Sequence, residues 1–337
     1  MSDRKQTVLV NDTFSDEVDV VFGVPQGSVL GPELFLTYTK RLLELIDRRS
    51  VLNQSFADDT QLYKSCTPAE IPSTILNLQE CIESIREWMA CNKLKLNDDK
   101  TEALLFHTQR SIQSFDMPDY IYVGTSQVKF SSSARNLGYT ISNTMSLELH
   151  VTNVCRSAYL ALRQISSIRQ FLSEDATKKL VCSFVLSRLD YCNSMLSGCP
   201  KYLVDRLQKV QNSAARLVFK TKKRQHVTPL LKTLHWLPIQ ARIDYKLSVL
   251  CHNYISGSAP EYFGQLLTIY TPSRQLRSSA DDSILVIPKV RTKTFGERSF
   301  LFCASRQWNS LPLNIRSIQS ITSFKAALKT YLFNNYY

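Results

Sequence analysis

The apolar residues change their spacing near residue 146, and no other feature of the sequence constrains the fold as strongly. Before that point, β-rich runs such as KQTVLV and EVDVVF are separated by turn residues, which predicts hairpins over residues 5–22 and 52–63. After it, apolar residues recur every three or four positions, which predicts amphipathic helices. The sequence therefore favours an α+β chain in which most strands precede most helices.

Two helices are expected among the early hairpins. Ser28 ahead of Gly31-Pro32 signals a helix over residues 28–46, and the capping-box pattern TPAE at 67–70 signals a second over 68–92. Both helices are expected on one face of a single antiparallel sheet. The buried face of the first is predicted to carry Leu34, Tyr38, Leu42 and Leu45. Further strands are predicted at KLKL (93–96), EALLF (102–106), IYVG (121–124), QVKF (127–130) and NLGYTI (136–141).

Five helices are predicted in the second part of the chain. Their apolar stripes span residues 151–168, 173–185, 203–217, 239–254 and 322–332. These stripes indicate a packed helical core rather than a functional surface. Residues 268–300 are rich in Ser, Arg and Thr and poorly periodic, so a long loop or weak strands are expected there.

The composition narrows the choice of partner and compartment. Lys and Arg number 41 against 29 Asp and Glu, and the formal charge of +12 favours a polyanionic partner. Nucleic acid is the first candidate, an anionic membrane surface the second, and an inert basic surface the alternative. No apolar run approaches the length of a membrane span, and the N-terminus lacks the apolar core of a secretion signal. The nine cysteines include no Cys-x-x-Cys pair, so we expect buried thiols, no zinc site, and a reducing compartment, nucleus or cytoplasm.

Two short motifs could carry chemistry. FADD (56–59) places the adjacent carboxylates of Asp58 and Asp59 at the tip of a predicted hairpin, where they suit a hard cation such as Mg²⁺ that also binds phosphate oxygens. In GVPQGSVLGP (23–32), the glycines allow the backbone to approach a ligand closely just before a helix. Each motif alone is also compatible with an ordinary turn or a plain entry into a helix.

The order of these motifs resembles that of reverse transcriptases from non-long-terminal-repeat, LINE-type retrotransposons. GVPQGSVLGP resembles motif B of that family, FADD motif C, KLKLNDDKTEALLF motif D and ARNLGYTIS motif E. LHWLPIQARIDYKL, RTKTFGERSF and RQWNSLP resemble the thumb and C-terminal region, so the resemblance covers nearly the whole chain. It implies a partial right-hand polymerase palm over residues 1–145, a helical thumb over 146–220, and a C-terminal helical and loop extension over 221–337.

The resemblance also implies a role for each motif residue. Asp58 would be a catalytic metal ligand and Asp59 a weaker or supporting one. Lys100 would lie near the triphosphate as a possible proton donor to pyrophosphate, although a solvated turn lysine is an equal alternative. The remaining assignments are Pro25, Gln26 and Gly27 in the pocket for nucleotide and template, and Leu137 and Gly138 near the primer end.

One essential part of the family's active site is not recognisable. A right-hand palm needs a further aspartate, from motif A, that follows an apolar strand upstream of motif B. Only 24 residues precede Pro25, and none of Asp3, Asp12, Asp16 and Asp19 follows such a strand. We therefore expect a truncated RNA-directed DNA polymerase, a nucleotidyltransferase without its motif A and fingers, that is inactive alone. Whether an upstream segment supplies motif A stays open.

The resemblance extends to cofactor and partners. Mg²⁺, RNA template and DNA primer belong to the complete enzyme, with Mg²⁺ weak or absent here, and no membrane partner is implied. The alternative is a non-catalytic module that binds RNA or DNA through the thumb, because residues 201–224 carry eight cations against Asp205 alone. The candidate phosphate contacts in this segment are Lys220, Lys222, Lys223 and Arg224. A third reading is an interaction protein that associates with itself through exposed palm surface.

Overall fold

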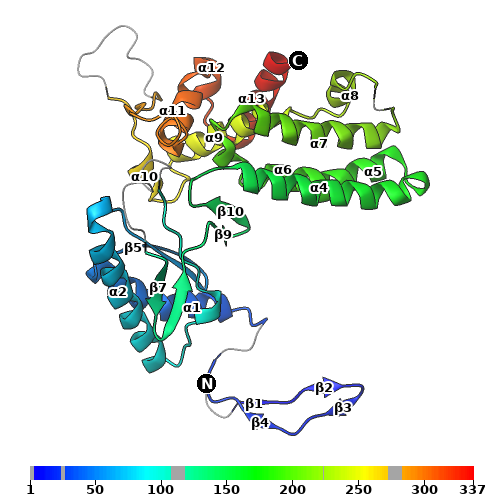
Figure 1. Cartoon of the computed structure of the whole chain (residues 1–337). Helices are drawn as coiled ribbons and strands as arrows, with labels where there is room; N and C mark the ends of the chain where they lie inside the picture. Colours follow the sequence, from blue (N-terminus) through cyan, green and yellow to red (C-terminus); the bar gives the residue numbers. More distant parts are fainter. Residues whose placement is uncertain (1–3, 24–26, 108–117, 223, 272–282) are drawn as a thin grey trace. The chain divides into compact units, whose positions relative to one another are not determined.

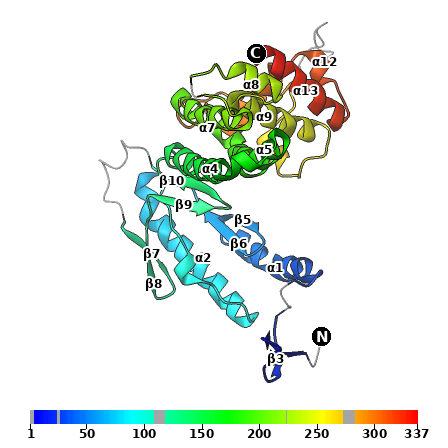
Figure 2. The same ribbon diagram turned by 90° about the vertical axis from the view of Figure 1, so that its right-hand side faces the viewer.

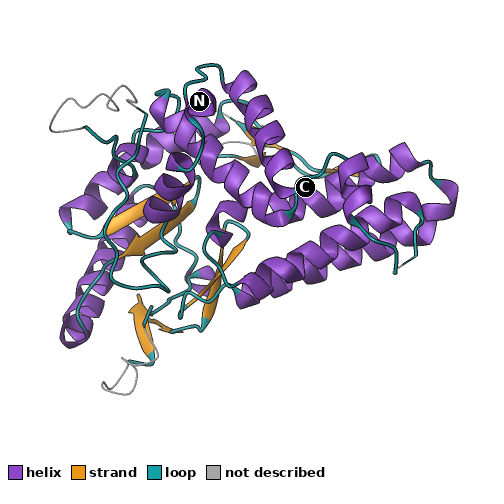
Figure 3. Ribbon diagram, turned by 90° about the horizontal axis from the view of Figure 1, so that it is seen from above, coloured by secondary structure: helices purple, strands orange, loops and turns teal. Residues whose placement is uncertain are grey.

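The computed structural model describes residues 4–23, 27–107, 118–222, 224–271 and 283–337. The chain divides into two compact units, Met1–Ala134 and Arg135–Tyr337. Helices outnumber strands, and the described strands form small antiparallel pairs, as Figure 3 shows. The predicted α+β class is therefore confirmed, whereas the palm and thumb assignments stay predictions.

The first element is a two-stranded ribbon, here called the N-terminal ribbon (residues 4–22). It consists of β1 (Lys5–Gln6), β2 (Leu9–Val10), β3 (Thr13–Phe14) and β4 (Val18–Asp19), with β1 paired to β4 and β2 to β3 (Figure 1). Asn11 and Asp12 close it with left-handed φ values of 47° and 61°. The predicted hairpin over residues 5–22 is thus confirmed, and its side chains are almost all exposed.

Helix α1 (Gly31–Arg48) begins with Pro32 in its first turn, as predicted. Its apolar face is buried only in its second half, where Leu42 and Ile46 contact the rest of the unit. Leu34 and Tyr38 are exposed, so the predicted continuous buried face is wrong for the first half. The reason is that the small core formed by Leu42, Ile46, Val51, Cys81 and Ile85 lies only at that second half of the helix.

Helix α2 (Ile71–Cys91) follows a 3₁₀ turn, Pro68–Glu70, and the predicted capping box. The Glu70 carboxylate accepts hydrogen bonds from the Thr67 N–H and hydroxyl, each 2.8 Å long. Between α1 and α2 lies the predicted hairpin of β5 (Leu52–Phe56) and β6 (Asp59–Tyr63), confirmed with a five-pair register. The hairpin of β7 (Tyr120–Val123) and β8 (Ser126–Lys129) is also confirmed and packs against α2 (Figure 2).

The single antiparallel sheet predicted for this unit is not formed. In the described ranges the strands make five separate two-stranded sheets. The segments KLKL and EALLF are not strands: Lys93 adopts a left-handed φ of 57°, Asp98–Lys100 forms a 3₁₀ turn, and only Ala103 bridges to another residue, Phe130. EALLF pairs with the chain that follows β8 only at Ala103, whose carbonyl accepts a 2.9 Å hydrogen bond from the Ser131 N–H, and a single bridge does not make a strand.

The second unit is helical apart from the hairpin of β9 (Ser133–Asn136) and β10 (Tyr139–Ser142) near its start. Its helices are α4 (Glu148–Ile168), α5 (Glu174–Val181), α6 (Ser187–Asp190), α7 (Lys201–Phe219), α8 (Thr228–Thr233), α9 (Ile239–Ile255), α10 (Phe263–Leu266), α11 (Phe300–Asn309), α12 (Leu313–Arg316) and α13 (Ile321–Tyr336). All five predicted helices are present. A π-helical turn, Cys182–Leu186, joins α5 to α6.

One hydrophobic core runs through this unit, including residues on both sides of the predicted boundary at 220. Helix α4 packs on α7, and α9 packs on α11 and α13. In the stretch predicted to be a loop or weak strands, Ile269 and Leu285 form an isolated bridge, and residues 272–282 lie outside the described residues. The predicted domain limits at 145 and 220 stay predictions.

Candidate functional site

The two adjacent carboxylates lie at the turn of the β5–β6 hairpin. Phe56 pairs with Asp59 to close the ladder, so Ala57 and Asp58 form the two-residue turn. Ala57 adopts a left-handed φ of 54°, a conformation that costs a residue with a Cβ about 1–2 kcal/mol. Asp58 and Asp59 are both exposed, which matches the predicted position of these carboxylates at a hairpin tip.

The donor set at this turn suits one hard cation held through few ligands. Neither Asp58 nor Asp59 forms an ion pair with a described residue. Within the described ranges, no group of three or more His, Cys, Asp or Glu side chains could hold a metal ion. Mg²⁺ accepts one or two protein carboxylates when water or phosphate fills its other positions, so the turn fits a single Mg²⁺. It does not fit two ions bridged by carboxylates from separate elements.

The hairpin is held from behind by the small core of the first unit. Val51, directly before β5, is buried, and Leu62 on β6 packs against the same cluster. The Asn53 side-chain amide donates a 2.8 Å hydrogen bond to the Asp47 carboxylate at the end of α1. The strands are therefore anchored at the end away from the turn, which leaves the two carboxylates open to solvent.

The predicted nucleotide loop is described only in part. Pro25 and Gln26 lie outside the described residues. Gly27 is exposed with φ of 90°, and no atom lies within 4 Å of the position that a Cβ would occupy. The glycine is therefore required by its backbone conformation and not by close packing, and the space beside it is open.

Lys100 lies on a turn that an ion pair fixes in place. It is the exposed last residue of the 3₁₀ turn Asp98–Lys100. The Arg86 guanidinium on α2 donates hydrogen bonds of 2.7 and 2.8 Å to the two carboxylate oxygens of Asp98. The guanidinium also lies against Gly124, where a Cβ would come within 2.5 Å of it. Arg86 thus joins α2, the Lys100 turn and the β7–β8 turn.

Arg86 was not anticipated from the sequence. Asp98 is 12 residues and Gly124 is 38 residues from Arg86 in the sequence. The spacing of residues within one helix or strand therefore does not predict these contacts. The only available signal was Gly124 itself, because an isolated glycine at a hairpin turn often marks a close approach. The structure brings Asp58 and Asp59 together on one turn and places Lys100 on another.

Leu137 and Gly138 form the turn between β9 and β10, with φ values of 44° and 83°. Positive φ at both central residues is the geometry of a tight two-residue hairpin turn. The Tyr191 hydroxyl donates a hydrogen bond to the Leu137 carbonyl, and its ring would lie 3.4 Å from a Cβ at Gly138. This turn belongs to the second unit, and its predicted role near a primer end stays a prediction.

Some cations of the basic segment 201–224 contact other residues of the protein, and others are open to solvent. Arg206 lies 3.8 Å from Glu148, and Arg216 donates to the Gln225 carbonyl at 3.3 Å. Lys220 ends the helix with a left-handed φ of 51° and is exposed, as are Lys222 and Arg224. Lys223 lies outside the described residues. Three of the four predicted phosphate contacts are therefore described, and all three are open to solvent.

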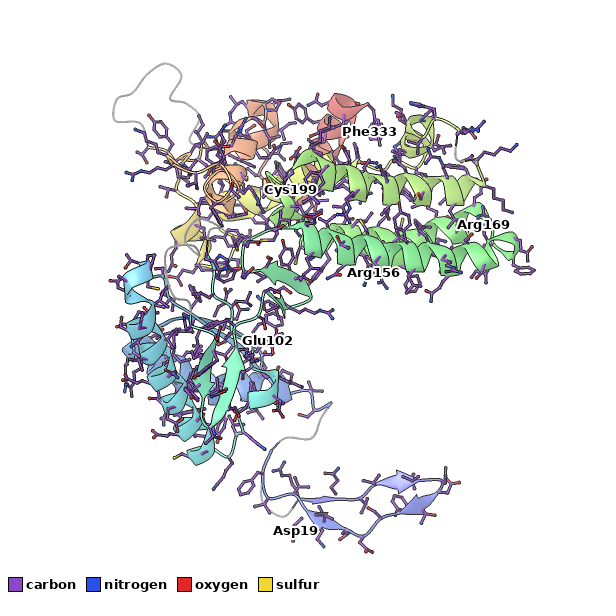
Figure 4. All side chains as sticks on the ribbon, in the orientation of Figure 1. Asp19, Glu102, Arg156, Arg169, Cys199 and Phe333 are labelled. Atoms are coloured by element: carbon purple, nitrogen blue, oxygen red, sulfur yellow. The ribbon has the colours of Figure 1, made fainter. Side chains whose placement is uncertain are left out.

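A buried arginine fixes the helix end from which this segment emerges. Arg169, only 6% exposed, donates hydrogen bonds to the carbonyls of Leu217 (2.9 Å) and Val218 (2.6 Å) in α7, and to that of Leu172 (2.6 Å). Figure 4 labels it at the end of α4 beside the last turns of α7. The last carbonyls of a helix lack intrahelical partners, so the guanidinium caps α7 from the side. Nothing in the sequence pattern predicted this role.

The expectation of buried thiols is confirmed for only part of the set: Cys81, Cys155, Cys251 and Cys303 are buried, whereas Cys66 and Cys91 are exposed. All nine are free thiols, and burial raises the pKa of Cys199 to about 11 and that of Cys251 to about 12. The thiols of Cys199 and Cys251 are therefore protonated and unreactive at neutral pH. In the part of the chain that the structure describes, no helix has the length and apolar character needed to cross a membrane.

Part of the sequence is similar to known proteins. Residues 7–141 match the family model for reverse transcriptase (RNA-dependent DNA polymerase). A probable RNA-directed DNA polymerase from transposon BS of Drosophila melanogaster is 27% identical over 229 residues, 65% of this chain and 24% of the relative. A probable RNA-directed DNA polymerase from transposon X-element of the same organism is 26% identical over 223 residues, 64% of this chain and 24% of the relative.

The polymerase from the mobile element jockey of Drosophila melanogaster is 24% identical over 159 residues, 46% of this chain and 17% of the relative. The chain thus spans about a quarter of the length of the curated relatives it matches. No solved structure matches it significantly. The predicted resemblance is supported as a similarity: residues 7–141 match the reverse transcriptase model, and the relatives found are retrotransposon polymerases. The individual motif roles stay predictions.

Proposed function

We propose that residues 1–145 are part of the palm of a retrotransposon RNA-directed DNA polymerase, and that the 337-residue chain does not extend primers alone. The observation that carries the proposal is the pair Asp58 and Asp59 at the open turn of a five-pair hairpin, inside the segment that matches the reverse transcriptase model. Phosphoryl transfer depends almost wholly on positioning and electrostatics, so a half-built site loses most of its rate.

The reaction in the complete enzyme assigns a task to each residue. The primer 3′ hydroxyl attacks the α-phosphorus of the incoming deoxynucleotide, a P–O bond forms, and pyrophosphate leaves. Divalent metal supplies charge neutralisation and lowers the pKa of the attacking hydroxyl when bound. Asp58 and Asp59 would orient that ion, and Lys100 would donate a proton to the leaving pyrophosphate. Gln26 and Gly27 would border the nucleotide, and Leu137 and Gly138 the primer.

The expected inactivity of the chain alone follows from the fact that both candidate metal-binding carboxylates lie on the same turn. Asp58 and Asp59 belong to one turn, and the acids of residues 12–19 belong to the N-terminal ribbon, a separate two-stranded sheet. Two ions about 4 Å apart need carboxylates from more than one element around them. A longer polypeptide that adds an upstream aspartate strand would supply the missing side.

Primer extension tests this proposal directly. With RNA template, DNA primer, deoxynucleotides and Mg²⁺, the 337-residue chain should show no extension, and a longer chain carrying the upstream segment should show it. Asp58→Asn in the longer chain should lower the rate by at least about a thousandfold, whereas Asp16→Asn, at an exposed aspartate of the N-terminal ribbon, should not. Extension by the 337-residue chain that Asp58→Asn abolishes would contradict its inactivity, and an unaffected Asp58→Asn longer chain would contradict the site.

The second candidate is nucleic-acid binding without chemistry. Three exposed cations follow or end α7: Lys220, Lys222 and Arg224. Arg169 holds the end of this helix through hydrogen bonds to its last carbonyls, so the three cations start from an anchored segment. Such cations neutralise phosphates without reading sequence. This function would persist in a chain that cannot catalyse.

A salt titration distinguishes this candidate from an inert basic surface. Changing Lys220, Lys222 and Arg224 to Ala should flatten the log–log dependence of affinity on salt by about 0.7 to 0.9 for each phosphate that is no longer neutralised. The matched control changes Lys246, Lys325 and Lys329, three exposed lysines on α9 and α13, and removes the same charge. Equal slopes for both triple variants would show that net charge alone, and not this segment, determines binding.

A further inference from the structure

The N-terminal ribbon leaves most of its apolar side chains more than half exposed. The exposed fractions run from 51% for Val8 to 70% for Val21. The other members of this set are Leu9, Val10, Phe14, Val18 and Phe22. An isolated two-stranded ribbon is at best marginally stable in water, whereas three or more strands with a shared apolar face are stable. The ribbon therefore has the composition of a strand pair that is completed by further strands.

The two edges of the ribbon differ in charge. The edge made by residues 5–10 contains no acid, and Lys5 is its only charged residue. The opposite edge, residues 13–19, contains Asp16, Glu17 and Asp19, and of these only Glu17 has a cationic partner among the described residues, Lys5 at 2.8 Å. Carboxylates on a strand edge oppose the addition of a like strand, because equal charges would face each other across the new pair. Only the edge at residues 5–10, here called the acid-free edge, is open to pairing with its own copy.

The backbone of the acid-free edge shows which groups are available. The Val8 carbonyl accepts a 2.9 Å bond from the Ser15 N–H, and the Val8 N–H donates a 2.9 Å bond to the Ser15 hydroxyl. The Arg4 carbonyl accepts from the Val20 N–H at 2.7 Å. Because alternate residues of a strand turn their backbone groups to opposite sides, those of Thr7 and Leu9 face outward.

We propose that two copies of this chain pair antiparallel through their acid-free edges and form a four-stranded sheet. The outward groups of Thr7 must then lie opposite those of Leu9 in the second copy, which puts Val8 opposite its own counterpart. In this register Arg4 of each copy, whose guanidinium also donates a 2.7 Å hydrogen bond to the Gly23 carbonyl of its own chain, lies opposite Asp12 at the turn of the other. A shift of two residues along the strand would place Arg4 opposite Val10 and lose both charge pairs. The Arg4–Asp12 charge pairs therefore favour both a second copy of this chain as the partner and this register of pairing.

The same geometry closes the assembly at two copies. The acid-free edges lie at the centre of the four strands, and Asp16, Glu17 and Asp19 of each copy lie on the two outer edges. A two-fold axis uses each acid-free edge once, so no open edge without carboxylates is left for a third copy. The sheet is a dimer and not a fibre, and this conclusion is independent of any polymerase function.

Sedimentation over a range of concentrations tests the dimer. The interface is small, so the monomer–dimer equilibrium should fall between about 1 and 100 µM. Leu9→Lys should raise the dissociation constant at least about tenfold because lysines would face the paired edge. Phe14→Lys is the matched control: Phe14 lies directly across the ribbon from Leu9 and is comparably exposed, at 68% against 54%, but on the outer edge. A monomer at every concentration, or equal effects of both variants, would overturn the proposal.

Cross-linking tests the register and does not depend on the strength of the dimer. With the exposed Cys66 and Cys91 changed to Ser, Val8→Cys should form an interchain disulfide. Directly opposed residues in a non-hydrogen-bonded antiparallel pair have Cα atoms about 4.5 Å apart, within the range that a disulfide spans. Thr7→Cys, opposite Leu9, should cross-link at least about tenfold more slowly. Equal rates for the two cysteines would overturn the register.

Removal of the outer carboxylates tests the closed state. Asp16→Asn, Glu17→Gln and Asp19→Asn together should convert the dimer into larger assemblies that sediment faster, because the outer edges would then resemble the inner ones. A triple variant that stays a dimer at every concentration would overturn the role assigned to these carboxylates.

Discussion

The two compact units differ in how completely they bury their apolar residues. Among the described residues, the core of Met1–Ala134 that surrounds α1 and α2 has five buried side chains, whereas a single cluster of forty runs through Arg135–Tyr337. Most of the segment that matches the reverse transcriptase model lies in the sparsely packed unit. Stability and the candidate chemistry of Asp58 and Asp59 therefore reside in different parts of the chain.

The difference arises from what each amphipathic element packs against. In the second unit every long helix has a helical neighbour, such as α4 with α7 or α9 with α13, so apolar stripes meet apolar stripes. In the first unit, α1 has buried residues only in its second half, and most apolar side chains of the N-terminal ribbon are more than half exposed. A polymerase palm is proposed for this unit, and an uncovered surface is what such a part would present without the rest of its enzyme.

The largest expected effect on stability comes from changing a phenylalanine in each of the two units. Phe324 is fully buried and stacks on His252 with ring centroids 4.2 Å apart, whereas Phe14 is 68% exposed. Phe324→Ala should lower the free energy of unfolding by about 3–5 kcal/mol, and Phe14→Ala by less than about 0.5 kcal/mol. Urea unfolding followed by fluorescence measures both, through Trp236 and Trp308 of the second unit for Phe324→Ala and through Trp88 of the first unit for Phe14→Ala. Similar destabilisation by the two variants would contradict the described difference in burial.

A buried charge should give the next largest effect. Arg169→Met keeps the volume of the side chain but leaves the carbonyls of Leu172, Leu217 and Val218 without their donor. We expect a loss of about 3 kcal/mol, because each unsatisfied buried carbonyl costs about 1–3 kcal/mol and water reaches part of them after the change. Arg163→Met on the exposed side of α4 is the matched control and should change stability by less than about 0.5 kcal/mol. A small effect of Arg169→Met would show that α7 does not need this cap.

The sequence predicted local structure well wherever a segment contains all the residues that determine its conformation. Residues 52–63 and 67–70 contain their own turn and capping residues, and both formed as expected. The long helices were equally readable, because an apolar stripe at helical spacing needs only some apolar partner.

Features that depend on a distant partner were missed or wrong. KLKL looked like a strand, yet it pairs with no described strand, and the first half of α1 looked buried, yet Leu34 and Tyr38 there are exposed. Arg86 with Asp98, and Arg169 with the end of α7, join residues 12 and about 48 positions apart through geometry that no period encodes. Within the candidate site, the position of Asp58 and Asp59 was predictable because the hairpin is local, whereas the support of the Lys100 turn was not.

The smallest expected effect concerns one buried histidine in the well-packed unit. His150 is 3% exposed, stacks on Tyr139 with ring centroids 3.9 Å apart, and accepts a 3.3 Å hydrogen bond from the Thr140 N–H through Nδ1. Burial lowers the pKa of His150 from its usual value of 6.5, because the charged imidazolium loses its hydration. Protonation at Nδ1 would also remove the acceptor that Thr140 uses.

The sign of the pH dependence follows from this depressed pKa. Below pH 6.5 the unfolded chain binds a proton at His150 that the folded chain does not, so the free energy of unfolding falls as the pH falls from 6.5 towards the folded pKa. Between pH 7.5 and 5.5 we expect a loss of at most about 1.4 kcal/mol, the limit for one proton over the pH unit below 6.5, in urea unfolding followed through Trp236 and Trp308. His150→Gln should remove this loss, whereas His226→Gln, at an exposed position, should leave it unchanged. The first unit contains no comparably buried histidine among its described residues, so a fluorescence change from Trp88 that followed the same pH profile would show that the two units do not unfold independently.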